Sequence, residues 1–130
     1  MKRLLLIVLP LLLIFGCSKP INEETLIDKD GLKYHPDTKE LYSGKVFKNH
    51  MGGKLHLEGS YKNGKKNGLS TEWYENGNIE VQRTFKNGEL DGLNTQWYEN
   101  GQKKVQGIFK DGKQVRSPKK WNEDGSVCND

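Results

Sequence analysis

The pentapeptide Trp-Tyr-Glu-Asn-Gly occurs twice in this chain, at residues 73–77 and 97–101, and a related sequence, Trp-Asn-Glu-Asp-Gly, follows at residues 121–125. Each copy begins 24 residues after the one before it. Self-similarity at a fixed period of about 20 to 50 residues is typical of stacked copies of one supersecondary unit. The spacing therefore limits this chain to a small set of repeat architectures.

Each unit contains two glycine turns, and most of these glycines follow Asn or Asp. Asn-Gly and Asp-Gly between alternating runs are strong hairpin signals, because these residues tolerate positive φ. The segments between the turns are six to nine residues long and lack helical spacing, so each unit is predicted to hold two strands and two turns. One turn series comprises Gly53, Gly77, Gly101 and Gly125, and the other comprises Gly64, Gly88 and Gly112.

Apolar residues fall mostly on odd-numbered positions of these strands, while even positions are polar apart from Tyr74 and Tyr98. A three-residue loop at residues 75–77 would place Trp73 and Ile79 on one face. We therefore expect an all-β fold, a single-layer curved antiparallel β-meander of hairpin repeats that is apolar on one face. Two aromatic ladders are expected to stack from repeat to repeat on that face: Trp73, Trp97 and Trp121, and Tyr61, Phe85 and Phe109.

The amino terminus reads as an export signal: two basic residues precede an apolar run at residues 4–15, which is too short to span a bilayer. The sequence Ile-Phe-Gly-Cys at residues 14–17 resembles the lipobox of bacterial lipoproteins, which implies cleavage before Cys17 and lipidation of that cysteine. An ordinary secretory peptide and an uncleaved anchor are the alternatives. The expected division is a signal peptide at 1–16, a lipidated tether at 17–27 and a repeat domain at 28–130.

Charge and cysteine content narrow the function classes. The chain has 21 Lys and Arg against 17 Asp and Glu, and loss of Lys2 and Arg3 with the signal leaves 19 against 17. Such a mixed-charge surface does not favour nucleic acid as a partner.

With Cys17 lipidated, Cys128 has no partner within the chain, so it is expected to be a free thiol, with an intermolecular disulfide as the alternative.

The units at residues 61–77 and 85–101 closely resemble the bacterial MORN-repeat variant, which occurs in small exported proteins commonly labelled antitoxin-like components of toxin–antitoxin systems. The resemblance extends over about residues 28–125 and implies an elongated sheet of β-hairpins with a curved face. It implies structural repeats and brings no catalytic chemistry with it.

The sequence offers little for catalysis. Its three histidines, His35, His50 and His56, form no ligand-spaced cluster, and the Met-Gly-Gly-Lys segment at residues 51–54 lacks the spacing of a phosphate loop. We therefore expect neither an enzyme, nor a metal site, nor a cofactor. The candidate binding residues are aromatic. Tyr74 and Tyr98, on the polar face, are the better candidates for contact with a partner. The others lie on the apolar face, where a core role is the favoured interpretation and a recognition groove the alternative: Trp73, Trp97, Trp121, Tyr61, Phe85 and Phe109.

These features predict a lipoprotein anchored to a membrane through Cys17, whose repeats bind a protein partner in the cell envelope, in one version as an antitoxin or immunity protein. The alternative is a repeat domain that binds lipid headgroups or cell-wall glycans directly. Ser18 is not the Asp that, as the lipoprotein resemblance implies, retains such proteins at the inner membrane. An outer-membrane or surface location is therefore expected.

Overall fold

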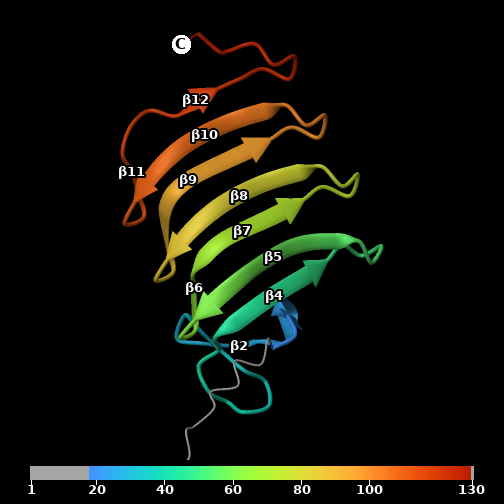
Figure 1. Cartoon of the computed structure of the whole chain (residues 1–130), viewed down its shortest axis with the longest axis vertical. Coiled ribbons are helices and arrows are strands. Elements are labelled where there is room, and N and C mark those ends of the chain that lie inside the picture. Colours follow the sequence, from blue (N-terminus) through green and yellow to red (C-terminus); the bar gives the residue numbers. More distant parts are fainter. Residues whose placement is uncertain (1–17, 130) are drawn as a thin grey trace, which may run out of the picture.

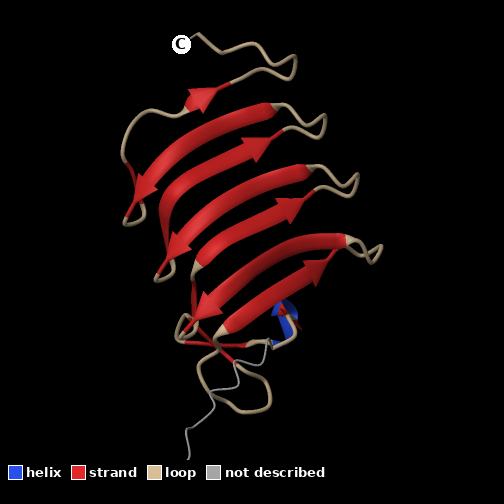
Figure 2. Ribbon diagram, viewed as in Figure 1, coloured by secondary structure: helices blue, strands red, loops and turns tan. Residues whose placement is uncertain are grey.

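The computed structural model describes residues 18–129, which form one long curved sheet with a short two-stranded ribbon at its amino-terminal end (Figure 1). Nearly all the regular structure is strand, with a single 3-10 turn, η1, among the described residues (Figure 2). The predicted all-β repeat meander is confirmed. The elements are β1 (Ile21–Asn22), η1 (Glu23–Thr25), β2 (Ile27–Lys29), β3 (Leu32–Tyr34), β4 (Gly44–Asn49), β5 (Leu55–Lys62), β6 (Lys65–Lys66), β7 (Gly68–Trp73), β8 (Ile79–Lys86), β9 (Glu89–Trp97), β10 (Lys103–Lys110), β11 (Lys113–Gln114) and β12 (Lys119–Lys120).

The ten-stranded sheet follows the order of the chain from β4 to β11, with β6 paired to β5 and β12 paired to β10. Neighbouring strands are antiparallel, as a meander of hairpins requires. The exception is β1, which pairs in parallel with β4 through Ile21 opposite Val46. A segment that precedes the repeats thus forms one edge of their sheet.

The three-residue loop predicted at residues 75–77 is present. The amide of Tyr74 donates to the carbonyl of Asn78 at 2.9 Å, the amide of Gly77 donates back to Tyr74 at 3.0 Å, and Gly77 has φ +89°. Glycine is suited to this position because it adopts positive φ at no steric cost. The same pair of bonds recurs in each unit, at the loops that start at His50, Tyr98 and Asn122.

The second turn series connects the units at the opposite ends of the strands. In each of these two-residue turns both positions have positive φ, as in Asn87 (50°) followed by Gly88 (82°). This is the geometry of a type I′ turn, whose twist matches that of the flanking strands. The Asn-Gly and Asp-Gly pairs therefore set the turn type as the sequence predicted.

A β-bulge changes which residues share a face. Trp73 lies opposite Ile79, but the register then shifts by one, so Glu72 lies opposite Val81. Residues opposite each other in an antiparallel ladder point to the same side of the sheet. The prediction that the odd positions of both strands share one face is therefore wrong, and Leu69 and Leu93 are half exposed on the other side.

We name the two sides from the resulting rows of residues. Face A carries the row Leu57, Glu72, Val81, Gln96 and Val105. Face B carries the row Glu58, Thr71, Gln82, Thr95 and Gln106. Face A is apolar only on the longer strands, because polar residues of the shorter strands alternate with the apolar ones.

The predicted stacking of aromatic rings between repeats is also wrong. Within residues 18–129, the ring pairs in contact are His35 with Tyr42, Tyr42 with Tyr61, and His50 with His56. Equivalent residues of successive repeats are two strands apart, about 9.5 Å, whereas ring pairs interact at about 4.5 to 7 Å. The intervening strand keeps the aromatic rings of each series apart.

The best-buried cluster lies at the amino-terminal end of face A and consists of Leu26, Tyr42, Val46, Leu57 and Tyr61. Leu26 follows η1, so the segment at residues 21–27, which the sequence suggested as part of a tether, takes part in the fold. Leu26 and Ile21 are the apolar residues that make this possible.

The predicted signal peptide and Cys17 lie outside the described residues. Within residues 18–129, no helix is long and apolar enough to cross a membrane.

Candidate binding surfaces

Side chains at the three-residue loops fasten each repeat to the next. The hydroxyl of Tyr74 donates to the carbonyl of Trp97 at 2.8 Å, and that of Tyr98 donates to the carbonyl of Trp121 at 2.9 Å. His50 takes this position in the preceding unit, where its Nε2 lies 2.7 Å from the carbonyl of Trp73. Tyr74 and Tyr98, the leading candidates for partner contact, thus have their hydroxyls engaged within the protein.

The loop asparagines add a parallel series of bonds. Nδ2 of Asn76 donates to the carbonyl of Glu99 at 2.9 Å, and Nδ2 of Asn100 donates to that of Glu123 at 2.8 Å. Burial raises the pKa of Tyr74 above its usual value, and the charges of the nearby glutamates 80 and 99 raise it further. The raised pKa favours the neutral hydroxyl of Tyr74, the form that donates to the carbonyl of Trp97.

Lysine side chains, rather than neighbouring aromatic rings, lie over several of the candidate rings. The ammonium group of Lys103 is 5.7 Å from the ring of Trp121, and that of Lys104 is 5.4 Å from the ring of Tyr98. Lys66 lies 5.4 Å from the ring of Phe85 on face A. Cation–π contacts of this kind contribute about 0.5 to 1 kcal/mol at exposed positions. A partner could therefore displace these lysine side chains from the aromatic rings at a small cost in free energy.

Face A presents three equivalent sites, each made of four residues spaced 24 apart from those of the next site. The first site is Val46, Leu57, Gly59 and Tyr61; the second is Ser70, Val81, Arg83 and Phe85; the third is Asn94, Val105, Gly107 and Phe109.

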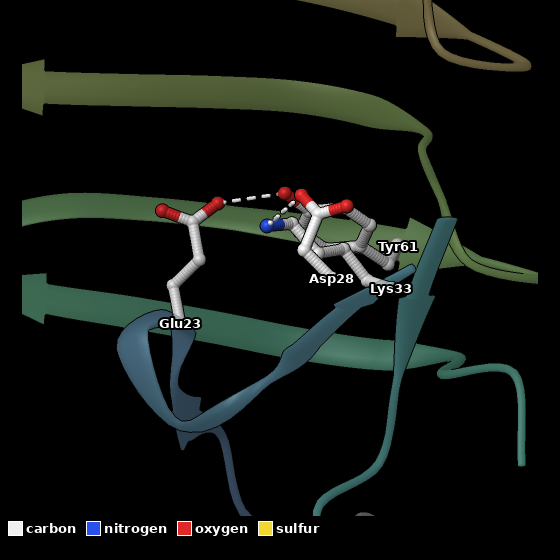
Figure 3. A network of polar contacts seen from close by, with 4 residues as sticks. All are labelled: Glu23, Asp28, Lys33 and Tyr61. Carbon is white, nitrogen blue, oxygen red and sulfur yellow. Dashed lines mark hydrogen bonds and ion pairs between the residues drawn. The ribbon is translucent and has the colours of Figure 1, made fainter. Parts of the chain in front are cut away.

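The protein's own amino-terminal segment fills the first site. Leu26 packs into the apolar cluster there, and the hydroxyl of Tyr61 donates to Oε1 of Glu23 at 2.8 Å (Figure 3). Burial, together with this bond to the carboxylate, raises the pKa of Tyr61 far above its usual value. The space that remains between Glu23 and the site residues has a volume of about 10 Å³. A separate cavity of about 320 Å³ borders Tyr61 and is lined by charged residues, among them Lys33 and Glu89.

An ion pair fills the second site. Arg83 extends its guanidinium to Oε1 of Glu72 at 2.5 Å, and the two side chains are 29% and 21% exposed. The arginine stands where the first and third sites have glycine. Its side chain therefore occupies the space that the amino-terminal segment fills in the first site.

Neither kind of filling is found at the third site. It borders a cavity of about 180 Å³ lined by uncharged residues: Asn94, Gln96, Val105, Gly107, Phe109, Gln114 and Pro118. Within the described chain, Oδ1 of Asn94 is buried and has no hydrogen-bond partner. Phe109 is thus a predicted candidate that borders an unfilled cavity of face A.

Face B carries a ladder of Thr and Gln side chains, whereas the sequence had placed Thr71 and Thr95 on the apolar face. Gln106 donates to Oγ1 of Thr95 at 3.0 Å, and Gln82 to Oγ1 of Thr71 at 3.4 Å. Thr95 is only 3% exposed. The recurrence of Thr and Gln 24 residues apart was the available signal, and it indicates a structural role for these pairs.

The structure brings His50 and His56 together, with Nε2 of the first 3.2 Å from Nδ1 of the second. Within residues 18–129 no group of three or more His, Cys, Asp or Glu side chains is placed to hold a metal ion. Asp28 forms an ion pair with Lys33 at 2.8 Å, visible beside Tyr61 in Figure 3.

Comparison with known proteins gives one match. Residues 66–87 and 90–111 each match the model of the MORN repeat variant, and the two matches are offset by the same 24 residues as the hairpins. Together the two matches cover 44 of the 130 residues. No curated protein and no solved structure matches the chain.

The two segments that match the MORN model lie at the centre of a longer periodic array, since the loop bonds that start at His50 and Asn122 continue their pattern on either side. MORN repeats generally serve as protein-binding modules and are typically non-catalytic. The described surfaces of the repeats are therefore the first candidates for a functional contact.

Proposed function

We propose that this protein is a non-enzymatic binding module whose MORN repeats present face A to a protein partner. The observation that carries the proposal is the unequal filling of the three equivalent sites, since two are occupied by the chain's own groups and the third is open. A site that only served the fold would be filled in every repeat, because unfilled apolar volume costs stability.

The second part of the proposal is a lipid anchor on Cys17, which would hold the module at a membrane of the cell envelope, with the outer membrane or cell surface favoured. The sequence around Cys17 supports it, and so does the position of Ile21 at the edge of the sheet, which leaves only residues 18–20 between the anchor and the fold. Such a short connection would hold the repeats close to the membrane. An antitoxin or immunity role is one form of this proposal.

Photo-crosslinking in intact cells tests the binding function. The full chain would carry benzoylphenylalanine at Phe85 or Phe109 on face A, or at Leu69 or Leu93 on face B, which are matched positions in the same two repeats. We expect a discrete protein adduct from face A and none from face B. Adducts of equal yield from both faces, or none from any position, would contradict the proposal.

Direct binding to lipid headgroups or wall glycans is the second candidate, favoured by the tryptophans near the loops, since Trp suits membrane interfaces. The three-residue loops beside these tryptophans carry acidic residues, among them Glu75, Glu99 and Glu123. Their negative charge opposes attraction to anionic lipid. Flotation of residues 18–130, which lack both Cys17 and the apolar signal segment, with phosphatidylglycerol vesicles separates the two candidates. Binding would favour the lipid candidate, and its absence the protein partner.

A further inference from the structure

We infer that the cavity at the third site of face A is a docking site for a peptide segment of the partner, which inserts one uncharged, leucine-sized side chain. This inference rests on the proposed protein-binding function and names the contact that performs it.

The first step of the argument is equivalence between sites. The first and third sites have glycine at the same repeat position, Gly59 and Gly107, and an aromatic residue two positions later, Tyr61 and Phe109. With the amino-terminal segment in place, the first site retains about 10 Å³, whereas the third has about 180 Å³. The difference corresponds to the segment that the third site lacks.

The chain itself shows what kind of occupant such a site accepts. At the first site the occupant is the irregular segment η1 with Leu26, whose side chain is 8% exposed among Val46, Leu57 and Tyr61. A cavity of about 150 Å³ is large enough to hold benzene. The third cavity is therefore of the right size for one leucine, isoleucine or phenylalanine side chain.

The polar groups of the third site define the rest of the occupant. Phe109 lacks the hydroxyl with which Tyr61 binds the carboxylate of Glu23, and no charged side chain lines the cavity in the described structure. Burial of a charge in such a site would be costly. The unpartnered Oδ1 of Asn94 requires a donor, which a peptide N–H supplies.

The ion pair of the second site can be introduced at the third site by substitution, which would fill the cavity there. Arg83 paired with Glu72 occupies the second site, and the corresponding residues of the third site are Gly107 and Gln96. Gly107 does not have positive φ, and a Cβ there would lie 3.4 Å from the ring of Phe109, an ordinary contact. The variant Gln96→Glu with Gly107→Arg therefore transfers an arrangement that this fold already contains.

The experiment is an NMR titration of the full chain, purified in detergent, with the blocked peptide Pro-Ile-Asn-Gln-Glu-Thr-Leu-Ile-Asp-Lys. This is the sequence of residues 20–29 with Glu23→Gln. We expect saturable shifts at the amides of Gly107, Phe109 and Gln114. The same peptide with Leu26→Ser should bind about tenfold more weakly or not at all, because the anchoring side chain is lost.

Two protein variants complete the test. Gln96→Glu/Gly107→Arg should lose the peptide by about tenfold or more, with its circular dichroism spectrum unchanged. Leu93→Arg introduces the same charge on face B and should bind as wild type does. Gly107→Gln fills the cavity without charge and replaces the double variant if the latter does not fold.

Three results of the peptide titration would overturn the inference: no shift at Gly107, equal binding of the leucine and serine peptides, or undiminished binding by the filled variants. A parallel titration with chitooligosaccharide gives the fourth. Shifts at Gly107 with this sugar alone would make the cavity a glycan site. A failed titration alongside a face A crosslink to a protein would show that the module binds elsewhere on this face. A successful titration without any crosslink would leave the cavity assignment intact and contradict the proposed function.

Discussion

The hydroxyl of Tyr98 donates to the backbone carbonyl of Trp121, 23 residues further along the chain, and Tyr74 has the same relationship to Trp97. A side chain from one repeat thus supports the backbone of the next. Stability in repeat proteins depends strongly on contacts between neighbouring units, so these bonds should determine how cooperatively the array unfolds.

Tyr98→Phe should loosen the carboxy-terminal hairpin without unfolding the rest. Loss of one such hydrogen bond costs about 1 kcal/mol, and the hairpin after Trp121 has no further repeat to support it within the described residues. Hydrogen exchange should accelerate at Trp121 and Cys128, whose amides bond to Lys104 and Lys120. Tyr74→Phe, in the middle of the array, is the matched control and should not affect these amides selectively.

Gly64 and Gly112 offer a comparison in which only the surroundings differ, since both have φ +79° in equivalent turns. A Cβ at Gly112 would meet Glu89 at 3.8 Å, whereas one at Gly64 would lie 2.8 Å from Leu41 and 3.0 Å from the carbonyl oxygen of Lys33. Gly112→Ala should cost about 1 kcal/mol for the left-handed backbone, and Gly64→Ala about 2 to 4 kcal/mol in total. Urea denaturation measures both, and equal costs would contradict the close packing of the amino-terminal segment.

The raised pKa of Tyr61 predicts a specific loss of stability in alkali. The folded state favours the neutral phenol, so this contribution is complete below the unfolded value of about 10 and declines as pH rises further. Tyr61→Phe should cost about 1 kcal/mol at neutral pH through the lost bond to Glu23. The difference between the two proteins should shrink above pH 10, as followed by urea denaturation at several pH values. A constant difference would contradict the structural assignment.

The Glu72–Arg83 pair should behave as a coupled unit. Removal of either partner leaves the other charge largely buried, so Arg83→Leu and Glu72→Gln should each cost about 1 to 3 kcal/mol. The double variant should cost less than the sum of the two, with a coupling of about 1 to 2 kcal/mol. Strict additivity in urea denaturation would show that the two charges do not interact in solution.

The proposed anchor makes a prediction that is independent of the repeats. A cysteine that carries two or more acyl chains is held stably at a membrane, which a single myristoyl chain is not. Metabolic labelling with an alkynyl fatty acid should therefore mark wild type and Cys128→Ser but not Cys17→Ser. Label retained in Cys17→Ser, or absent from wild type, would contradict lipidation at Cys17.

The sequence predicted the hairpins and turns of this fold better than it predicted which residues share a side of the sheet. Asn-Gly and Asp-Gly pairs specify local backbone geometry, so both turn series could be located from composition and spacing alone. The bulge beside Trp73 has no such signature, because it is a change of register between two strands rather than a property of one residue. That shift, and its equivalent beside Trp97, moved Leu69 and Leu93 to the opposite side from the one predicted.

The candidate site was predictable only in part. Aromatic residues were correctly noted as a recurring series, and Phe109 borders the open cavity. What distinguishes the three sites is the Gly59, Arg83, Gly107 series, whose members align at the 24-residue period. The functional meaning of this series depends on which groups occupy each of the three sites. Leu26 occupies the first site through a contact between segments distant in the sequence, which no local sequence pattern predicts.

The bonds between loops also bear on how a protein of this kind changes its length. Each of the two central units supplies a donor to the unit after it and an acceptor to the unit before it, and both turn types fall within one period. Deletion of residues 68–91 would join Asn67 to Gly92 and give His50 the carbonyl of Trp97 in place of that of Trp73. Duplication or loss of one coding segment can therefore lengthen or shorten the array in whole steps, leaving its ends and the remaining junctions chemically unchanged.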